Sequence, residues 1–228
     1  MGTYLVTGIG RGIGCELARI LLHRGDRVIG TLRDPNQMLP EWSEFIAGGQ
    51  LMLLALDVRD DASIRAAAAS LDGSIDVLVN TAGVIGSQRQ STLDMDFNGF
   101  LEILNVNTLG PLRMVQAFLP HLRRSKAAKI VTISSRMGSL SYAKSDRIAY
   151  RASKAAVNKV MQGLATDLRE DGIVAISVHP GWVQTDMGGS GADISVGESA
   201  AGLVRLIDRL RLDDTGEFFD WQGARISF

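Results

Sequence analysis

The chain has 228 residues, 46% of them hydrophobic and 21% charged, and its formal net charge of −1 completes a composition typical of globular proteins. So small a net charge excludes a strong field for nucleic acid or an anionic membrane, and no apolar run approaches the ~20 residues that a membrane span needs. The single cysteine, Cys15, excludes an intrachain disulfide and the three scattered histidines lack ligand spacing, so we expect no metal site and a reducing, cytoplasmic setting.

Short apolar runs rich in valine, isoleucine and leucine recur along the whole chain. They do not alternate cleanly between apolar and polar residues, which is typical of strands buried on both faces of a sheet. Strands are therefore predicted at residues 3–7, 27–32, 51–58, 75–80, 129–134, 174–179 and, more weakly, 217–221.

Helical patterns separate several of these strands. Helices are predicted at residues 13–25, 100–124 (with an internal Gly110-Pro111), 149–172 and 196–210, and loops at 70–76 and 188–193. Strand and helix alternate from end to end, which predicts an α/β fold with one parallel sheet, doubly wound by helices on both faces.

The first predicted strand runs directly into the glycine-rich segment TGIGRGIG, residues 7–14. Glycine costs conformational entropy, so four in eight residues indicate either a plain turn or a loop whose backbone something must approach closely. The strand before the loop and the helix after it favour the second interpretation. There, the glycines let a pyrophosphate reach the free N–H groups at the helix N-terminus, which predicts dinucleotide binding.

The spacing Thr7-Gly8-x-x-x-Gly12-x-Gly14 resembles the T-G-x-x-x-G-x-G fingerprint of the short-chain dehydrogenase/reductase family. With the motifs below, the resemblance covers essentially the whole chain. It implies a single NAD(P)-binding Rossmann-type domain of about seven strands over residues 1–228, with the substrate site built in.

Three further segments follow the family pattern in order. The segment LDV places Asp57 at a strand end, where family members hydrogen-bond the adenine; a plain loop aspartate is the alternative. NTAG, residues 80–83, resembles the family's N-N-A-G, with Thr81 in place of the second asparagine. Asn107, in NVNTLGP, matches the active-site asparagine, although an asparagine that caps or disrupts a helix is a serious rival.

The segment YRASK carries the family's Y-x-x-x-K at Tyr150 and Lys154. Residues four apart on a helix share a face, so the Lys154 ammonium is expected near the phenol. A nearby positive charge favours the phenolate, and we expect it to lower the pKa of Tyr150 from about 10 toward the working range. A tyrosine so tuned donates a proton to a carbonyl oxygen or accepts one from an alcohol. An ordinary surface pair is the alternative, because Y-x-x-x-K alone is common.

Upstream, the predicted strand KIVTIS delivers a serine to its carboxyl end, where open α/β sheets place their sites. Family members use a serine here to hydrogen-bond the substrate oxygen, and the resemblance assigns that role to Ser135. Ser134 and Ser139 are its rivals, and a loop-capping serine is the alternative for each.

The segment HPGWVQTDM resembles the family's P-G-x-x-x-T. Pro180 and Gly181 form a turn after a strand, and the resemblance implies that Thr185 contacts the nicotinamide carboxamide, with Val183 nearby. A turn followed by a capped helix is the alternative. Together with YRASKAA, this segment is similar to the sequences of the subgroup that contains the C-factor protein and the sniffer-type carbonyl reductases.

The second predicted strand ends on Leu32, at a place where NAD-preferring enzymes usually carry an acid, and Arg33 follows directly. Arginine suits a 2′-phosphate through its planar fork, and Arg11 is expected to close on it from the glycine loop. NADP(H) is therefore the predicted cofactor and NAD(H) the alternative, because Asp34 is placed to neutralise Arg33. The cofactor contacts implied by the resemblance are Gly8, Arg11, Gly12, Ile13, Gly14, Arg33, Asp57, Val58, Asn80, Ala82, Gly83, Tyr150, Lys154, Pro180, Gly181, Val183 and Thr185.

The implied catalytic residues are Asn107, Ser135, Tyr150 and Lys154, for the reversible reduction of an aldehyde or ketone. The alternative is a dinucleotide-binding signalling or regulatory protein of the C-factor type with little turnover. The complete Ser-Tyr-Lys set argues against it, since a pure binder needs only the glycine loop. The expected partner is a small carbonyl or alcohol substrate, without nucleic acid or membrane. Relatives often form homodimers through the two long helices, but some are monomers.

Overall fold

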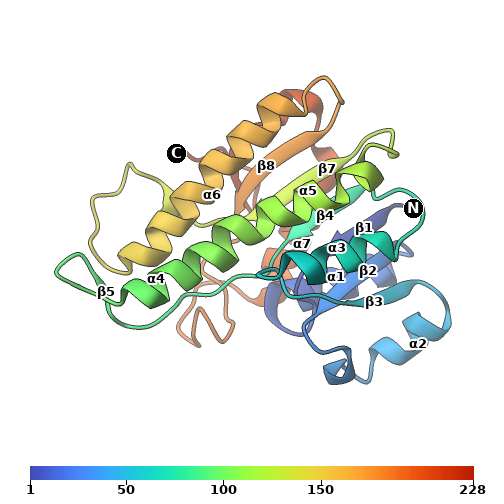
Figure 1. Ribbon diagram of the computed structural model, residues 1–228, viewed down its shortest axis with the longest axis horizontal. Helices are drawn as coiled ribbons and strands as arrows, with labels where there is room; N and C mark the ends of the chain where they lie inside the picture. The colour runs from blue at the N-terminus through green and yellow to red at the C-terminus, as the bar shows by residue number, and fades with distance from the viewer.

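The computed structural model describes residues 1–228, apart from the side chain of Gln37. A seven-stranded sheet runs through the molecule, and every neighbouring pair of its strands is parallel (Figure 1). Its spatial order is β3-β2-β1-β4-β7-β8-β9, so the direction of winding reverses between β1 and β4. The strands are β1 (Thr3–Val6), β2 (Arg27–Leu32), β3 (Leu51–Ala55), β4 (Val77–Asn80), β7 (Lys129–Ile133), β8 (Val174–His179) and β9 (Phe218–Asp220).

Helices cover both faces of the sheet, as the alternating pattern predicts (Figure 1). On one face lie α1 (Gly12–His23), α7 (Val196–Arg209) and the short α2 (Trp42–Ala47). On the other lie α3 (Asp61–Ala69), α5 (Gly110–Leu122) and α6 (Ile148–Asp167). Each layer buries its own apolar core against the sheet, with Leu17 and Leu203 at the centre of one and Phe118 and Met161 at the centre of the other. The predicted doubly wound α/β fold and its seven strands are confirmed.

The predicted helix at residues 100–124 is three consecutive helical segments rather than one. It comprises α4 (Phe97–Leu104), a π-helical turn η2 (Asn105–Leu109) and then α5. Gly110 begins α5 where a β-carbon would lie only 3.1 Å from Cβ of Val58, so the helix can approach the loop after β3 closely. The π-helical turn therefore lies where the chain passes the carboxyl edge of the sheet, a place where such turns often mark functional sites.

Other departures from the expected pattern are local. The helix predicted to end at Gly172 ends at Asp167, and a short turn with a positive φ at Gly172 leads into β8. The pattern misses α3, whose capping residue Asp60 accepts a hydrogen bond from the Ala62 backbone. It also misses α2, the hairpin β5 (Gln90–Ser91) and β6 (Asp94–Met95), and the 3₁₀ turns η1 (Pro35–Gln37), η3 (Arg136–Gly138) and η4 (Leu212–Asp214). Within the described chain, no helix combines the length and apolar character that crossing a membrane requires.

Candidate active site

The glycine loop joins β1 to α1 at the carboxyl edge of the sheet. Gly8 and Gly12 have φ angles of 73° and 59°, the left-handed region that favours glycine. A β-carbon on Gly14 would lie 2.6 Å from the carbonyl oxygen of Gly8, so the helix start packs directly on the loop. No side chain caps the N-terminus of α1, and its first turn contains no acid. These backbone N–H groups fit a pyrophosphate, and Ile13 behind them packs against the core.

The loop after β8 lies beside the glycine loop. The methyl carbon of Thr185 is 3.6 Å from the position of a β-carbon on Gly12, and Arg11 forms an ion pair with Asp186. The hydroxyl of Thr185 accepts a hydrogen bond from the Gly188 backbone at 3.1 Å. These contacts place the predicted nicotinamide-binding segment next to the predicted pyrophosphate-binding segment.

Contacts with α7 and within the loop itself hold the turn that follows β8. The carbonyl of Pro180 accepts a hydrogen bond from Ser199 of α7 at 2.6 Å, and Gly181 has a φ of 91°. Val183 pairs with Ile194 in a single parallel bridge, which closes the loop at its base.

The NTAG segment ties the end of β4 to the end of β1. The Thr7 hydroxyl accepts hydrogen bonds from the backbone N–H groups of Thr81 (2.9 Å) and Ala82 (3.0 Å), and the Thr81 hydroxyl donates to the Thr7 carbonyl. Asn80 donates to Thr132 on β7 at 3.1 Å. Thr81 therefore supports the turn from the position where the family pattern has asparagine.

Asn107 lies in the π-helical turn and is almost completely buried. Its amide oxygen accepts from the Val84 backbone at 2.9 Å, and its amide nitrogen donates to the Val84 carbonyl at 2.8 Å and to the Ser153 hydroxyl at 3.0 Å. A β-carbon on Gly83 would lie 3.3 Å from that amide oxygen. Asn107 thus connects the turn after β4 to α6, the helix that carries Tyr150.

Tyr150 and Lys154 lie one turn apart on α6, as the spacing predicts. The Lys154 nitrogen is 5.7 Å from the centre of the Tyr150 ring and donates to the Ile133 carbonyl at the end of β7, 2.7 Å away. Burial lowers the pKa of Lys154 to about 8. Both functional groups therefore lie where β7 ends.

The expectation that the pKa of Tyr150 falls is wrong for this arrangement. Burial raises it to about 12, and a hydrogen bond with Ser135 and the charge of Arg147 lower it only in part. Removing the phenol from water outweighs the charge of Arg147 and the hydrogen bond with Ser135, because the phenolate loses its hydration.

Of the three candidate serines, Ser135 is the one whose side chain acts on the Tyr150 phenol. Its hydroxyl also accepts a hydrogen bond from the Met137 backbone and caps η3. Ser134 is tied to the Lys154 carbonyl at 3.3 Å, and Ser139 accepts a hydrogen bond from the Ser141 backbone at 3.3 Å. This geometry favours Ser135 over its rivals.

The acidic and basic residues after β2 and β3 take different partners. Asp34 caps η1 by accepting a hydrogen bond from the Asn36 backbone at 3.0 Å, and no ion pair among the described side chains involves Arg33. Asp57 instead pairs with Arg59 at 2.6 Å, which lowers the pKa of its carboxyl. Arg33 is thus exposed and available to an anion, whereas Asp57 is held in its own turn.

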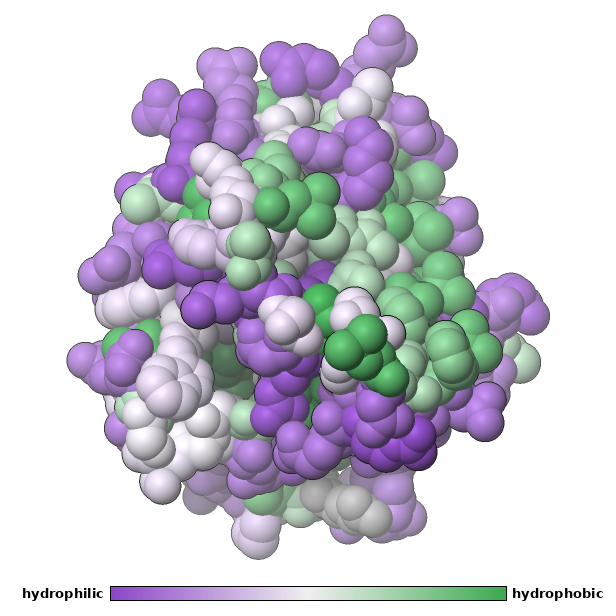
Figure 2. All heavy atoms as spheres, turned by 90° about the vertical axis from the view of Figure 1, so that its left-hand side faces the viewer, coloured by the Kyte–Doolittle hydropathy of each residue, from purple (hydrophilic) through white to green (hydrophobic). Residues whose placement is uncertain are grey.

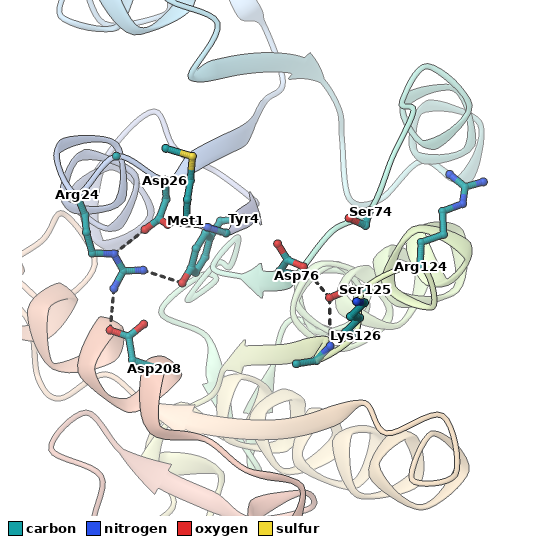
Figure 3. A pocket seen from close by; sticks show the side chains of 13 residues that line it. Met1, Tyr4, Arg24, Asp26, Ser74, Asp76, Arg124, Ser125, Lys126 and Asp208 are labelled. Carbon is teal, nitrogen blue, oxygen red and sulfur yellow. Dashed lines mark hydrogen bonds and ion pairs between the residues drawn. The ribbon is translucent and has the colours of Figure 1, made fainter.

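A cavity of about 750 Å³ lies at the opposite, amino edge of the sheet (Figure 3). Several of its charged groups are paired: Arg24 forms ion pairs with Asp26 (2.5 Å) and Asp208 (2.7 Å), and Asp76 accepts a hydrogen bond from Ser125. Open α/β sheets place their sites at the carboxyl edge, so this network is best explained as structural. It links the end of α1 to α7, and the start of β4 to the segment that follows α5.

Comparisons with known proteins decide the family. The model of the short chain dehydrogenase family matches residues 3–193. The chain belongs to this family. As a short-chain dehydrogenase it is an oxidoreductase, and the predicted family is confirmed.

Individual relatives confirm the predicted subgroup. This dehydrogenase is 44% identical over 156 residues to the C-signal of Myxococcus xanthus, a match that spans 68% of this chain and 93% of the relative. An NADPH-bound carbonyl reductase from chicken fatty liver superposes with a TM-score of 0.92 at 32% identity, covering 100% of this chain and 99% of that one. The carbonyl reductase Sniffer of D. melanogaster gives a TM-score of 0.92 at 28% identity, covering both chains completely.

Sequence reasoning missed several residues that hold the site together. Gln90, on the hairpin, accepts a hydrogen bond from the Tyr150 backbone at 2.9 Å, and Ser153 joins Asn107 to α6. Arg147, just before α6, acts on the phenol. Only the position of Ser153 and Arg147 within three residues of Tyr150 could have drawn attention to them; Gln90 carries no local signal.

Proposed function

We propose that this dehydrogenase is an NADP(H)-dependent reductase that converts an aldehyde or ketone to an alcohol, reversibly. The observation that carries the proposal is the meeting of Ser135, Tyr150 and Lys154 where β7 ends, on the same edge of the sheet as the glycine loop. When bound, NADPH supplies the hydride for the carbonyl carbon. In this proposal, residues 1–228 form one domain that holds both cofactor and substrate.

The protein's own part in the reaction is to move the proton and hold the oxygen. Tyr150 donates its phenolic proton to the carbonyl oxygen, and in alcohol oxidation it takes a proton back. A pKa of about 12 keeps the phenol protonated at neutral pH, as an acid must be. Ser135 hydrogen-bonds the substrate oxygen, and the Lys154 ammonium stabilises the phenolate that forms and holds the nicotinamide ribose. The π-helical turn at Asn107 supports a role for that residue in positioning a proton-relaying water.

The glycine loop and Arg33 support the choice of cofactor. The uncapped N-terminus of α1 fits a pyrophosphate, and the exposed Arg33 guanidinium fits the 2′-phosphate that distinguishes NADP(H) from NAD(H). The structural neighbour from chicken fatty liver is described as NADPH-bound. The remaining proposed cofactor contacts are Asp57, Val58, Asn80, Ala82, Gly83, Pro180, Gly181, Val183 and Thr185.

The decisive experiment measures NADPH oxidation over a panel of aldehydes, ketones and quinones, repeated with NADH. Tyr150→Phe should lower turnover by about 10²–10⁴-fold while NADPH still binds, because only the proton donor is lost. Tyr142→Phe, on the exposed loop before α6, is the matched control and should change neither. A protein that binds neither dinucleotide, or a Tyr150→Phe variant with full turnover, contradicts the proposal.

A second candidate is a dinucleotide-binding regulator with little turnover. The observation that favours it is the 44% identity to the C-signal of Myxococcus xanthus. In that case NADPH binds in a titration, but no carbonyl in the panel is reduced above the rate of the Tyr150→Phe variant.

The homodimer through the long helices is also a proposal. Phe97 and Leu101 on α4 are 75% and 66% exposed, and Leu93 on the adjoining hairpin is 96% exposed. Figure 2 views the end of the molecule that carries α4 and the hairpin, and apolar residues gather on the right-hand side of that view. A second copy of the chain would remove this surface from water. Light scattering measures the molar mass in solution, and Phe97→Glu should lower it from that of a dimer to that of a monomer.

A reducing compartment such as the cytoplasm is a further part of the proposal, and the free, buried Cys15 supports it.

A further inference from the structure

Arg147 has an unusual backbone conformation next to the catalytic residues. Its φ of 50° and ψ of 46° make it the one non-glycine residue of the described chain with a positive φ. For most L-amino acids this left-handed conformation costs roughly 1–2 kcal/mol, whereas glycine and asparagine adopt it more easily. Such strain persists where the surroundings enforce it, and often at functional sites.

The Arg147 guanidinium has no ion pair or hydrogen bond with another described side chain. Its neighbour Arg151 differs, since it pairs with Asp146 at 2.7 Å. Arg147 is also only partly exposed, so a charge there is not fully compensated by water.

Arg147 lies close to the reacting group. It precedes Tyr150 by three residues, and, after burial and the hydrogen bond with Ser135, its charge is the third influence on the pKa of that phenol. On the other side, Arg136 follows Ser135 directly and likewise lacks an ion pair among the described side chains. Two cations without an ion pair among the described side chains thus flank the proposed catalytic Ser-Tyr pair.

Of these two arginines, Arg147 is the better candidate for binding an anion. Arg136 lines a cavity of about 150 Å³ that it shares with Asp193 and Asp220, and these carboxylates oppose an anion there. The nearest acid to Arg147 in sequence, Asp146, is engaged by Arg151. The planar guanidinium of arginine suits a carboxylate in a two-point contact.

We propose that Arg147 is a specificity-determining residue that binds a carboxylate carried by the aldehyde or ketone substrate. The inference rests on the proposed carbonyl reduction. The hydride from NADPH bonds to the carbonyl carbon and the Tyr150 proton bonds to its oxygen. The carboxylate remains ionised and unchanged, and serves only to orient the substrate.

A pair of aldehydes of similar size tests the proposal: 4-carboxybenzaldehyde, which is anionic, and its neutral methyl ester. Each is reduced with NADPH by the wild type, by Arg147→Asn and by Arg205→Gln. Asparagine tolerates the left-handed backbone, so the first variant removes the charge without new strain. Arg205, exposed on α7 without an ion pair among the described side chains, controls for the loss of one positive charge.

For the wild type, the KM for 4-carboxybenzaldehyde should be about tenfold or more below the KM for its methyl ester. A difference of this size is expected from one charge-assisted hydrogen bond. Arg147→Asn should abolish this ratio and affect kcat equally for both aldehydes, whereas Arg205→Gln should keep it. Raising the salt concentration should reduce the ratio in the wild type.

The two possible failures are distinguishable. Reduction of both aldehydes with equal KM, or a ratio that survives in Arg147→Asn, overturns the role of Arg147 and leaves the reductase proposal standing. Reduction of neither aldehyde with either dinucleotide overturns both proposals. Thermal unfolding of Arg147→Asn should occur at the wild-type temperature or above it, which separates a binding effect from misfolding.

Discussion

The Lys154 nitrogen lies 5.7 Å from the centre of the Tyr150 ring and is held by the Ile133 carbonyl, so one helical turn of α6 and the end of β7 together position the pair. Burial shifts the two groups in opposite directions, lowering the pKa of Lys154 to about 8 and raising that of Tyr150 to about 12. In both cases the charged form is disfavoured. At neutral pH the phenol is protonated in the folded and the unfolded chain alike, so the free-energy cost of burial falls on the protonated Lys154 amine.

The first prediction is that Lys154→Met stabilises the protein and inactivates it. Lowering the pKa from 10.5 to about 8 corresponds to about 3 kcal/mol of destabilisation while the amine is charged. The variant also loses the hydrogen bond to Ile133, which offsets about 1 kcal/mol of this stabilisation. The free energy of unfolding, measured in urea at pH 7, should therefore be about 2 kcal/mol higher than that of the wild type. Turnover should fall at least about 10²-fold.

The control for this variant is Lys159→Met, which removes an exposed amine from the same helix. It should change the free energy of unfolding by less than about 0.5 kcal/mol. A Lys154→Met protein that is less stable than the wild type would show that burial of the amine is not costly.

The second prediction concerns stability in acid. His179, at the end of β8, is largely buried with its Nδ1 unpartnered among the described atoms, and burial, helped by the charge of Arg136, lowers its pKa to about 4. An unfolded histidine takes up its proton near pH 6.5 and the folded one only near pH 4. Between these values the unfolded chain binds more protons, so stability falls as the pH falls.

Urea unfolding at pH 7, 5.5 and 4.5 measures this loss, which should reach about 2 kcal/mol at pH 4.5. In His179→Gln the side chain does not titrate, and the decline across this window should flatten. An equally steep decline in the variant would assign the acid sensitivity to other groups.

Much of the fold and the site follows from the sequence, for identifiable reasons. Buried parallel strands are continuous apolar runs, so all seven are recognisable, and Tyr150 and Lys154 carry their relationship in their spacing. The hairpin around Gln90 is too short for a pattern, and the π-helical turn at Asn107 depends on packing against α6. The raised pKa of Tyr150 was not predictable, because spacing places a charge nearby but gives no measure of burial.

The third prediction compares two glycines that differ in their surroundings. A β-carbon on Gly138, in η3, would lie 2.6 Å from the carbonyl carbon of Lys154 and 2.9 Å from the nitrogen of Ala155. These are backbone atoms that cannot move aside, so Gly138→Ala should separate η3 from α6 and cost about 1–3 kcal/mol. Turnover should fall too, because Ser135 caps this same turn.

Gly163→Ala is the matched control, since nothing lies within 4 Å of its β-carbon position in the interior of α6. There alanine should stabilise the helix by roughly 0.5–1 kcal/mol and leave turnover unchanged. Thermal unfolding and steady-state rates measure both variants, and equal effects at the two positions would argue against close packing of η3 on α6.

The fourth prediction separates the two arginines proposed for the 2′-phosphate. Arg33 is exposed without an ion pair among the described side chains, so Arg33→Ser should weaken NADPH binding about tenfold or more and leave NADH binding nearly unchanged. Arg11 is paired with Asp186, and both side chains are more than three-quarters exposed, so the pair contributes little to stability. Asp186→Asn should therefore release Arg11 and tighten NADPH binding at no cost in unfolding temperature. Fluorescence titrations with both dinucleotides measure these effects, and a parallel loss of NADPH and NADH affinity in Arg33→Ser would remove the 2′-phosphate from the interpretation.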